Sequence, residues 1–379
     1  MKIHRIGVLG PHRRGMISLL AHQPENGFEV TAICGASNEG LERYTEKCGS
    51  DVRYATDYRE ITDSPDIDIV FVCTPDFLHF EHAKAALEAG KFVFLEKPMA
   101  INVPDCDRLL ELAGKHGGKL YVGHNMRFFP VMRKMRELIE DGRIGEVEAI
   151  WCRHFVGDGG DYYFKNYNSE REYTTSLLLQ KGAHDIDIIH WLGGAYTKRV
   201  TGMGKLSVYN RVTDRQELDG YGDRGERNVS NWPPLTQTGL SKKIDVEDHN
   251  MILMQLENGV QASYMECFYT PDYHRNYTVI GTEGRIENYG DHSVDPNWAS
   301  IHLWNRRTTY TELGHEVFRI PPTQGSHGGA DPLMIEDFLQ FVKTGKTNSA
   351  PPLAARMAVA VGCGGAESMR SGSMPTDIA

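Results

Sequence analysis

The sequence has few cysteines, no closely spaced cysteine pair and no excess of basic residues. An odd number of scattered cysteines argues against a disulfide framework or a zinc knuckle and predicts reduced thiols. The seven are Cys34, Cys48, Cys73, Cys106, Cys152, Cys267 and Cys363. With 41 basic against 51 acidic residues and a formal net charge of -10, the chain has no global basic surface that would attract nucleic acid or anionic lipid.

The sequence also lacks a long apolar run and the pattern of a secretion signal. No stretch is long and apolar enough to span a bilayer. Residues 1–7 lead directly into a short apolar strand, without the longer apolar stretch and small-residue cleavage site of a signal peptide. We therefore expect a cytoplasmic protein without nucleic-acid or membrane partners.

At 379 residues, the chain exceeds the size at which one hydrophobic core keeps growing, so two domains are expected. In the first third, short β-branched runs alternate with amphipathic stretches, which is typical of a parallel sheet with crossover helices. The predicted strands are 5–9, 29–34, 69–74, 92–95 and 120–123, and the predicted helices are 15–22, 38–47, 79–89 and 104–116. Residues 1–124 are expected to form a doubly wound α/β domain of Rossmann type.

Residues 125–379 are expected to form a second domain for substrate binding and oligomerisation. A helix is predicted over 132–140, and strands over 148–155, 250–256, 261–268, 277–280 and 301–304. Because Asn258-Gly259 between two of these strands is a hairpin signal, we expect an α+β domain with a large, mostly antiparallel open sheet and helices on one face. Asp331-Pro332 predicts a helix cap, and a last helix over about 353–369 is expected to pack here or back on the first domain.

Two segments interrupt this regularity. Residues 157–175 are crowded with tyrosines, including Tyr163, and residues 209–243 are polar and contain Trp232-Pro233-Pro234. Long irregular segments in compact domains are commonly lids or binding loops. A subunit-contact arm is the equally weighted alternative.

A glycine turn follows the first predicted strand and opens a helix, the context in which a GxGxxG pattern indicates dinucleotide binding. Gly10 and Gly15 fit the first and third glycines, but His12 replaces the middle one, which normally lets the backbone approach the pyrophosphate. His12, Arg13 and Arg14 are candidates to hold phosphate by charge at a helix amino terminus. A tight turn that binds nothing is the alternative.

The end of the second predicted strand should carry an acid for the ribose hydroxyls if the cofactor is NAD. Gly35 stands in that place, which removes a repulsion against the 2′-phosphate of NADP. Ser37 is a candidate donor to that phosphate, and Arg43 lies one helical turn away. The cofactor is therefore expected to be NAD or NADP, with the choice open.

Two further residues are candidates for chemistry. Lys97 follows an apolar strand and precedes Pro98, which favours an extended backbone pointing the lysine into the ligand crevice at the strand ends; an exposed surface lysine is the alternative. A helix from residue 183 to Gly193-Gly194 would place His184 and Asp187 on one face, so that a carboxylate orients the imidazole. Taken alone, such a histidine is more often structural.

Together these pieces resemble the glucose-fructose oxidoreductase/inositol dehydrogenase/rhizopine catabolism (Gfo/Idh/MocA) family, in order along nearly the whole chain. The matching segments are the glycine turn, Cys73-Thr74-Pro75 followed by His79, Ala89-Gly90-Lys91 leading to Glu96-Lys97-Pro98, Asn125-Met126-Arg127-Phe128, Gly142-Arg143-Ile144-Gly145-Glu146, His184-Asp185-Ile186-Asp187 and Gly281-Thr282-Glu283-Gly284.

The resemblance implies that Lys97 and His184 flank the reacting carbon. It also implies that the nicotinamide lies near Thr74, Pro75, Glu96 and Arg127, with His79 in the same cofactor-binding set, and that the open sheet mediates dimer or tetramer contacts. One departure stands out: many members carry aspartate four residues before the histidine, where this chain has Gln180 followed by Lys181.

We therefore expect an NAD(P)-dependent oxidoreductase that acts on a secondary hydroxyl of a sugar, cyclitol or glycoside, or on the matching ketone. His184 is the expected base, and Lys97 is expected to stabilise the alkoxide. The expected substrate-binding residues are Asn125, Tyr163, Lys181, His184 and Asp187. Two alternatives stay open: a redox-neutral glycoside-cleaving enzyme that retains NAD and works through a keto-sugar and elimination, and a dinucleotide-binding regulator without turnover. No metal is assigned, because His184 and His190 would diverge on a helix.

Overall fold

The computed structural model describes residues 2–35, 40–221, 227–291, 299–321, 325–346 and 349–379. By their internal contacts they form two compact units, Met1–Phe128 with Gly329–Arg356, and Phe129–Gly328 with Met357–Ala379. Residues 329–356, which the sequence grouped with the second domain, thus pack with the first. No helix in the described ranges is long and apolar enough to cross a membrane.

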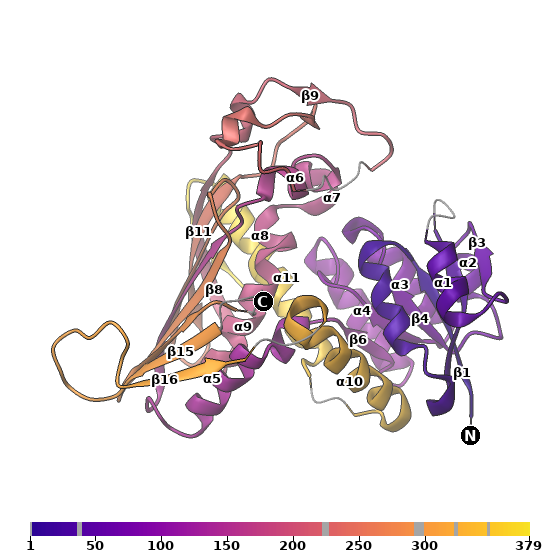
Figure 1. The fold of residues 1–379 in the computed structure, drawn as a ribbon, viewed down its shortest axis with the longest axis horizontal. Helices are drawn as coiled ribbons and strands as arrows, with labels where there is room; N and C mark the ends of the chain where they lie inside the picture. The colour runs from indigo at the N-terminus through magenta and orange to yellow at the C-terminus, as the bar shows by residue number, and fades with distance from the viewer. Residues whose placement is uncertain (1, 36–39, 222–226, 292–298, 322–324, 347–348) are drawn as a thin grey trace. The chain divides into compact units, whose positions relative to one another are not determined.

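The first unit is built on a six-stranded parallel sheet of order β3-β2-β1-β4-β5-β6, the doubly wound arrangement that the sequence predicted. Its strands are β1 (His4–Leu9), β2 (Phe28–Cys34), β3 (Arg53–Ala55), β4 (Ile69–Val72), β5 (Phe92–Leu95) and β6 (Leu120–Val122). Its helices are α1 (Leu41–Cys48), α2 (Arg59–Thr62), α3 (His79–Glu88), α4 (Val103–Lys115) and α10 (Ala330–Thr344), with 3-10 turns η1 (Arg13–Ala21), η2 (Pro24–Asn26), η3 (Asp76–Leu78) and η4 (Asn125–Phe128). Figure 1 shows these strands in indigo and purple.

In the first unit, the sequence missed the short strand β3 and the short α-helix α2, which are too brief to leave a periodic pattern. Two details were wrong. The helix predicted over 15–22 is a 3-10 helix beginning at Arg13. Asp331 is not the cap of α10, because Gly329 holds that position in the left-handed conformation and Asp331 lies in the first turn. The helix predicted over 104–116 is α4, and it begins one residue earlier, where Asn102 caps it by accepting a hydrogen bond from Asp105 N.

Helix α10 covers part of the first sheet through aromatic packing. The ring of Phe338 lies 5.3 Å from each of the rings of Phe71, Phe94 and Tyr121, centroid to centroid. The Tyr121 hydroxyl also donates to Asp337 Oδ2 at 3.0 Å. Edge-on contacts of this kind add to the hydrophobic burial of the rings, so a segment more than 200 residues away in the sequence completes the core of the first unit.

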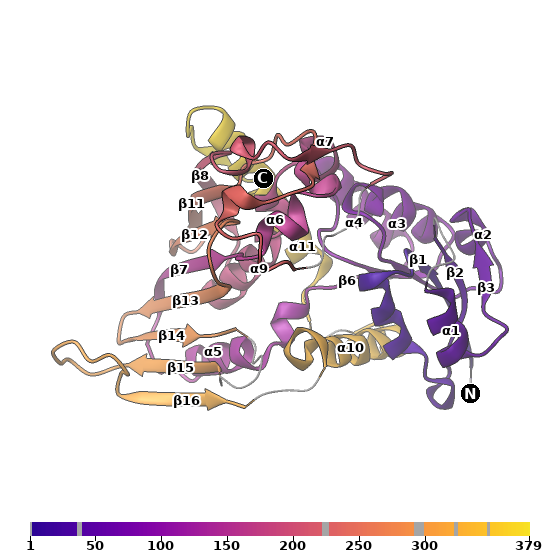
Figure 2. The same ribbon diagram turned by 45° about the horizontal axis from the view of Figure 1, so that its top comes forward.

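The second unit is built on a nine-stranded sheet of order β16-β15-β14-β13-β7-β12-β11-β8-β17. All neighbours pair antiparallel except β7 and β12. Figure 2 shows most of these strands side by side in this order. The strands are β7 (Val147–Phe155), β8 (Thr197–Lys205), β11 (His249–Leu256), β12 (Gln261–Cys267), β13 (His274–Gly281), β14 (Arg285–Tyr289), β15 (Ala299–Trp304), β16 (Glu316–Ile320) and β17 (Thr376–Asp377). The predicted hairpin joins β11 to β12, with Gly259 at a φ of 98°.

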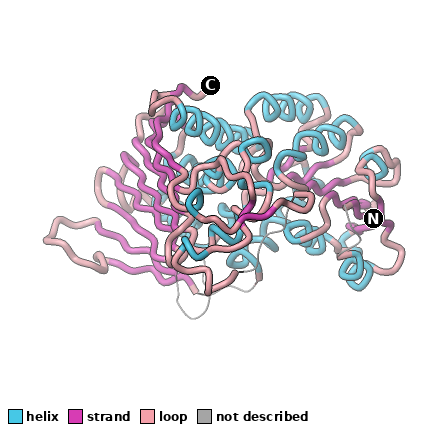
Figure 3. The backbone as a smooth tube through the Cα atoms, turned by 90° about the horizontal axis from the view of Figure 1, so that it is seen from above, coloured by secondary structure: helices cyan, strands magenta, loops and turns pink. Residues whose placement is uncertain are grey.

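Helices α5 (Pro130–Glu140) and α9 (Gly182–Gly193) pack on one face of this sheet together with α11 (Pro352–Arg370), whose first residues belong to the first unit. Figure 3 shows helices gathered along one side of the strands. The predicted helix over 353–369 therefore packs mainly on the second unit, where Gly362 approaches Leu179 and Gly365 approaches Ile252. The 3-10 turn η8 (Ser326–Gly329) precedes α10.

The two irregular segments pack on each other within the second unit. They contain α6 (Gly159–Tyr163), η5 (Tyr167–Ser169), α7 (Arg171–Thr174), η6 (Tyr209–Arg211), β9 (Arg215–Gln216), η7 (Pro234–Thr236) and β10 (Leu240–Ser241), and α8 (Leu177–Gln180) follows the first segment. The buried carboxylate of Asp161 joins them by accepting from Asn231 Nδ2 at 2.8 Å, Asn228 N at 3.1 Å and Gln237 Nε2 at 3.2 Å. This carboxylate gives residues 227–237 a fixed attachment to α6.

Replacing Phe338 with alanine should destabilise the first unit by about 3–5 kcal/mol, because it leaves a cavity among four aromatic rings. Leu333→Ala on the same helix is the control, since Leu333 is 40% exposed. Urea denaturation followed by circular dichroism measures both. Equal midpoints for the two variants would contradict the assigned packing.

Candidate active site

The carboxyl-terminal edge of the first sheet brings together four of the predicted site segments. Backbone hydrogen bonds continue the ladder past the strand ends: Gly10 N donates to Cys34 O, Cys73 N to Leu9 O, and Glu96 N to Val72 O, each at 2.9 Å. The glycine turn, Thr74-Pro75, Glu96-Lys97 and η4 therefore follow neighbouring strands along one edge. In open α/β sheets ligands bind at this edge, at the point where the strand order reverses, which here lies between β1 and β4.

The glycine turn is shaped by close backbone approach. A Cβ atom on Gly15 would lie 1.9 Å from Gly10 O, and one on Gly10 would lie 2.7 Å from Cys73 O. The Gly15 carbonyl accepts from the hydroxyls of Ser18 at 2.8 Å and Tyr44 at 2.9 Å. Side chains at these two glycines are excluded, so the turn fits the tight strand-to-helix connection on which a dinucleotide pyrophosphate rests.

Arg14 joins this turn to the end of β5 and to α10. Its Nε donates to Glu96 Oε1 and its Nη1 to Asp331 Oδ2, both at 2.6 Å. Burial alone would lower the pKa of Arg14, but the two carboxylates hold that pKa above its ordinary value. The sequence offered Arg14 as a phosphate ligand; the structure pairs its charge with two buried acids, while Arg13 is exposed with a φ of 46°. Glu96 is 5% exposed and takes part in this bridge.

His79 ties two loops of this edge together. Its Nδ1 lies 2.6 Å from Pro98 O, and its Nε2 lies 2.9 Å from Thr74 O. The ring is 1% exposed and wedged between these carbonyl acceptors. The Thr74 hydroxyl in turn lies 3.0 Å from His82 Nδ1. His79 thus links the backbones of the loops that carry Thr74 and Lys97, which is a positioning contact inside the predicted cofactor set.

The remaining predicted residues of the first unit lie on the same edge. Pro75 precedes η3, Lys97 is half-buried directly after Glu96, and its backbone N donates to Glu96 Oε2 at 3.2 Å. Asn125 is buried and Arg127 half-buried, both in η4. Ser37 lies outside the described residues.

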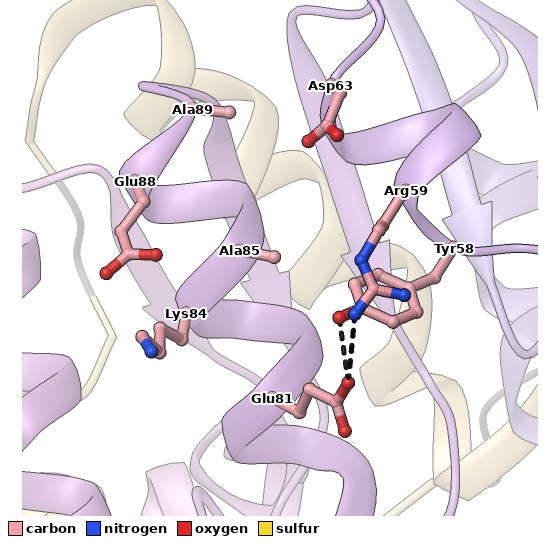
Figure 4. A pocket seen from close by; sticks show the side chains of 8 residues that line it. All are labelled: Tyr58, Arg59, Asp63, Glu81, Lys84, Ala85, Glu88 and Ala89. Carbon is pink, nitrogen blue, oxygen red and sulfur yellow. Dashed lines mark hydrogen bonds and ion pairs between the residues drawn. The ribbon is translucent and has the colours of Figure 1, made fainter.

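A separate pocket lies between α2 and α3, away from these loops. It is lined by Tyr58, Arg59, Asp63, Glu81, Lys84, Ala85, Glu88 and Ala89. Figure 4 shows Glu81 turned toward Tyr58 and Arg59 across it. None of the predicted site residues lines this pocket.

The second unit places its candidate residues on and around α9. The helix spans Gly182–Gly193 and ends at Gly194 in the left-handed conformation, as the sequence predicted. His184 is half-buried and Asp187 buried, on one face by their spacing. Lys181 precedes the helix, with its Nζ 5.9 Å from the ring centroid of Tyr163.

Tyr163 and His190, which lies near the end of α9, are each held by contacts with neighbouring side chains of the second unit. Tyr163 is 5% exposed and packs edge-on against Phe268 at 5.3 Å. His190 Nε2 accepts from Thr197 N at 3.2 Å and lies 2.8 Å from the Thr197 hydroxyl. In the part of the chain that the structure describes, no group of three or more His, Cys, Asp or Glu side chains is arranged to hold a metal ion.

The sequence missed a buried polar network around Asp185, the residue that follows His184. Asp185 is fully buried, and its Oδ1 lies 3.0 Å from Arg275 Nε and its Oδ2 3.1 Å from His154 Nδ1. The Tyr277 hydroxyl donates to the same carboxylate. Burial alone would raise the pKa of Asp185, but the Arg275 guanidinium and His154 hold that pKa well below its ordinary range. The strand predicted over 148–155 contains His154, but the strand predicted over 277–280 begins after Arg275, which the structure includes in β13. No local motif connected either residue to α9.

His154 is held in its neutral form by the same network. Burial and the neighbouring Arg275 lower the pKa of His154 to about 4. Arg275 Nη2 lies 3.2 Å from His154 Nε2, which can only accept from a guanidinium, so Nδ1 carries the proton that faces Asp185. Helix α9 is therefore fixed to β7 and β13 at the residue directly after His184.

Glu266 on β12 is a second buried acid of this network. Its carboxylate accepts from Asn250 Nδ2 at 2.5 Å and from the Tyr264 hydroxyl at 2.8 Å. Burial raises the pKa of Glu266 to about 8, even though these hydrogen bonds act in the opposite direction. The Tyr264 hydroxyl also lies 3.3 Å from His154 Nδ1, so Glu266 and Asp185 belong to one network.

Comparison with known proteins agrees with this architecture. Residues 4–124 match the model of the oxidoreductase family's NAD-binding Rossmann fold, and residues 136–378 match the model of its C-terminal alpha/beta domain. The chain belongs to the Gfo/Idh/MocA family of oxidoreductases. It is an enzyme of an NAD-binding family, and the structure has the parallel sheet and the mostly antiparallel open sheet of this family.

Individual relatives of this Gfo/Idh/MocA protein are distant. The chain is 28% identical over 307 residues to the Bacillus subtilis (strain 168) protein YteT, named as an oxidoreductase, covering 71% of each chain. It is 29% identical over 217 residues to Myo-inositol 2-dehydrogenase of Thermotoga maritima, covering 57% of this chain and 62% of that protein. A levoglucosan dehydrogenase solved with NADH and levoglucosan has a TM-score of 0.77 at 20% identity, with both chains fully covered, and shows the likeness of fold.

Replacing Glu266 with glutamine should change the pH dependence of stability. A glutamate of pKa 4.5 in the unfolded chain that rises to about 8 on folding adds stability that is fully present below about pH 4.5. That stability is lost as the pH rises to about 8, at up to about 1.4 kcal/mol per pH unit. Glu266→Gln, which mimics the protonated acid, should be more stable than the wild type at pH 9 and similar at pH 5. Chemical denaturation at the two pH values measures this.

Glu257→Gln, at the exposed turn between β11 and β12, is the control and should follow the wild type at both pH values. A Glu266→Gln variant whose free energy of unfolding differs from the wild type by the same amount at pH 5 and pH 9 would contradict a protonated Glu266 in the folded protein.

Proposed function

We propose that this protein oxidises a secondary hydroxyl of a sugar, cyclitol or glycoside with NAD or NADP, or reduces the matching ketone. The observation that carries the proposal is the sheet edge where the glycine turn, the Thr74 loop and the Lys97 loop meet at the strand-order switch. The names of the relatives support the substrate class, since one is a myo-inositol dehydrogenase and another structure is a levoglucosan dehydrogenase.

The proposed chemistry divides between the two units. The nicotinamide, when bound, supplies the hydride acceptor. Lys97 donates a hydrogen bond from Nζ to the substrate oxygen and stabilises the alkoxide as it forms, and His184 accepts the hydroxyl proton on its imidazole. We assign Gly10, Gly15, Arg13, Thr74, Pro75, Glu96 and Arg127 to the cofactor side. We assign Asn125, Lys181, Asp187 and the aromatic segment containing Tyr163 to the substrate side.

The buried network supports the role of His184. Asp185 is anchored to Arg275, His154 and Tyr277. These contacts fix the rotation of the first turn of α9 about the helix axis relative to the sheet. The imidazole of the preceding residue is thereby presented in one direction. His79 has the corresponding positioning role in the first unit, where it links the Thr74 and Lys97 loops.

One observation favours a second candidate, a redox-neutral enzyme that keeps its cofactor and cleaves a glycoside through a keto-sugar. Gln180, at the end of α8 and 4% exposed, stands where the family resemblance leads one to expect an aspartate. The Gln180 side chain is an amide, which does not accept a proton at neutral pH. A proton that His184 takes from the substrate therefore cannot pass to a carboxylate at position 180.

Replacing Lys97 with methionine or His184 with alanine should lower kcat by about 10²–10⁴-fold, because each removes a group that acts on the reacting oxygen. Reduction of the dinucleotide by a panel of cyclitols and sugars, followed by its absorbance, measures the rate. Lys198→Ala, at an exposed position of β8, should keep wild-type turnover. Unchanged turnover in His184→Ala would remove the base assignment.

We also propose that the open face of the second sheet joins copies of the chain into a dimer or tetramer. Across β8, β11 and β12, Met203, Met251 and Met265 stand opposite one another in register, and Leu253 lies in the next outward row. Met203 is 64% exposed and Leu253 62%. Exposed apolar side chains that lie side by side on a regular sheet are typical of an interface. The scattered cysteines favour action in the cytoplasm.

Introducing charge on this face should dissociate the assembly. Leu253→Glu should lower the mass measured by light scattering to that of a monomer, since a carboxylate would be buried between two copies. Val229→Glu, at a residue 78% exposed outside this sheet, is the control and should leave the mass unchanged. A wild-type protein that is monomeric at micromolar concentration would contradict the proposal.

A further inference from the structure

The side chain of His12 lies at the end of β2. A Cβ atom on Gly35 would stand 3.3 Å from His12 Nε2, and one on Gly40 would stand 3.3 Å from His12 Nδ1. The imidazole therefore lies beside both glycines, one just after β2 and one just before α1. The residue that interrupts the glycine pattern is thus turned toward the place where a Rossmann domain recognises the adenosine ribose.

Gly35 is the position at which NAD-binding domains carry a ribose-binding acid. A side chain there is sterically disfavoured in this chain, since its Cβ would also stand 3.0 Å from Pro11 Cδ. The space that an acid would use is thus bordered by the imidazole and the proline ring. In this chain the polar group beside Gly35 is the imidazole of His12 and not a carboxylate.

Among the described residues, one nitrogen of this imidazole has no hydrogen-bond partner. It is His12 Nε2, which is buried. Buried polar nitrogens are normally satisfied by protein, water or ligand, so this nitrogen marks a position for a ligand atom. Arg14 is a half-buried cation of the same turn, but its guanidinium is paired with Glu96 and Asp331.

We propose that this protein binds NADP in preference to NAD, with His12 Nε2 donating a hydrogen bond to the 2′-phosphate. The inference rests on the proposed nicotinamide-dependent function. A carboxylate after β2 would repel that phosphate, whereas an imidazole N–H donates to it, and hydrogen bonds to a charged acceptor are stronger than those to a ribose hydroxyl. His12 is then the residue that sets cofactor specificity, and its place in the glycine turn is explained.

Isothermal titration of the full-length protein with NADP⁺ and with NAD⁺ tests the inference directly, without turnover. The wild type should bind NADP⁺ at least about tenfold more tightly, the expected size of one hydrogen bond to a charged group. His12→Ala should lose most of this preference, with NAD⁺ affinity within about twofold of the wild type. Adenosine 2′,5′-bisphosphate against 5′-AMP should repeat the difference, because this pair isolates the 2′-phosphate.

Two further variants serve as controls for the loss of the His12 side chain. His12→Gln retains a donor and should keep part of the preference, and His116→Ala, at the end of α4, should keep all of it. Thermal melting of each variant checks folding. Equal or tighter binding of NAD⁺ by the wild type, or an unchanged ratio in His12→Ala, would overturn the inference while leaving the proposed function intact. Binding of neither dinucleotide would overturn both.

Discussion

The buried pair of Arg275 and Asp185 fixes helix α9, and the chemistry proposed for His184 depends on it. Both side chains are almost fully buried, and Arg275 also donates to Asp291 Oδ2 at 2.8 Å, so Arg275 is the cation that compensates two buried carboxylates. Removing one partner of a buried pair typically costs about 3–5 kcal/mol. His154, the Tyr277 hydroxyl and the Cys152 thiol are further partners of the Asp185 carboxylate. Because several polar partners hold the Asp185 carboxylate, the network favours one arrangement of helix and sheet, which a purely apolar contact specifies less strictly.

Buried ion pairs also connect separate segments of the first unit. Arg14 connects the glycine turn, the strand that leads to Lys97 and the start of α10 through two buried carboxylates. His79 adds a second link between the Thr74 and Lys97 loops. The Thr74 and Lys97 loops, which are proposed to contact the cofactor and the substrate, therefore have backbones that are linked to one another, as a preorganised site requires. Helix α10 belongs to this arrangement, which explains why a segment near residue 330 packs with the first 128 residues.

Much of the fold was predictable because its signals are local. The β-branched runs of β1, β4 and β5, the Asn258-Gly259 hairpin and the glycine end of α9 each follow from a few adjacent residues. What the sequence did not reveal is long-range pairing. Arg14 was expected to meet phosphate, but its partner Asp331 lies 317 residues away, and Asp185 lies 90 residues from Arg275. Charges alone cannot indicate which acid a given arginine will meet.

The reaction proposed for this protein moves a hydride from a carbon bearing a hydroxyl group to a nicotinamide. A cyclitol or sugar that supports turnover, deuterated at that carbon, gives the most direct measurement when the recovered dinucleotide is analysed by mass spectrometry. Hydride transfer of this kind should leave one deuterium in the reduced dinucleotide for each ketone formed. Product formed while the dinucleotide remains oxidised and unlabelled would contradict it.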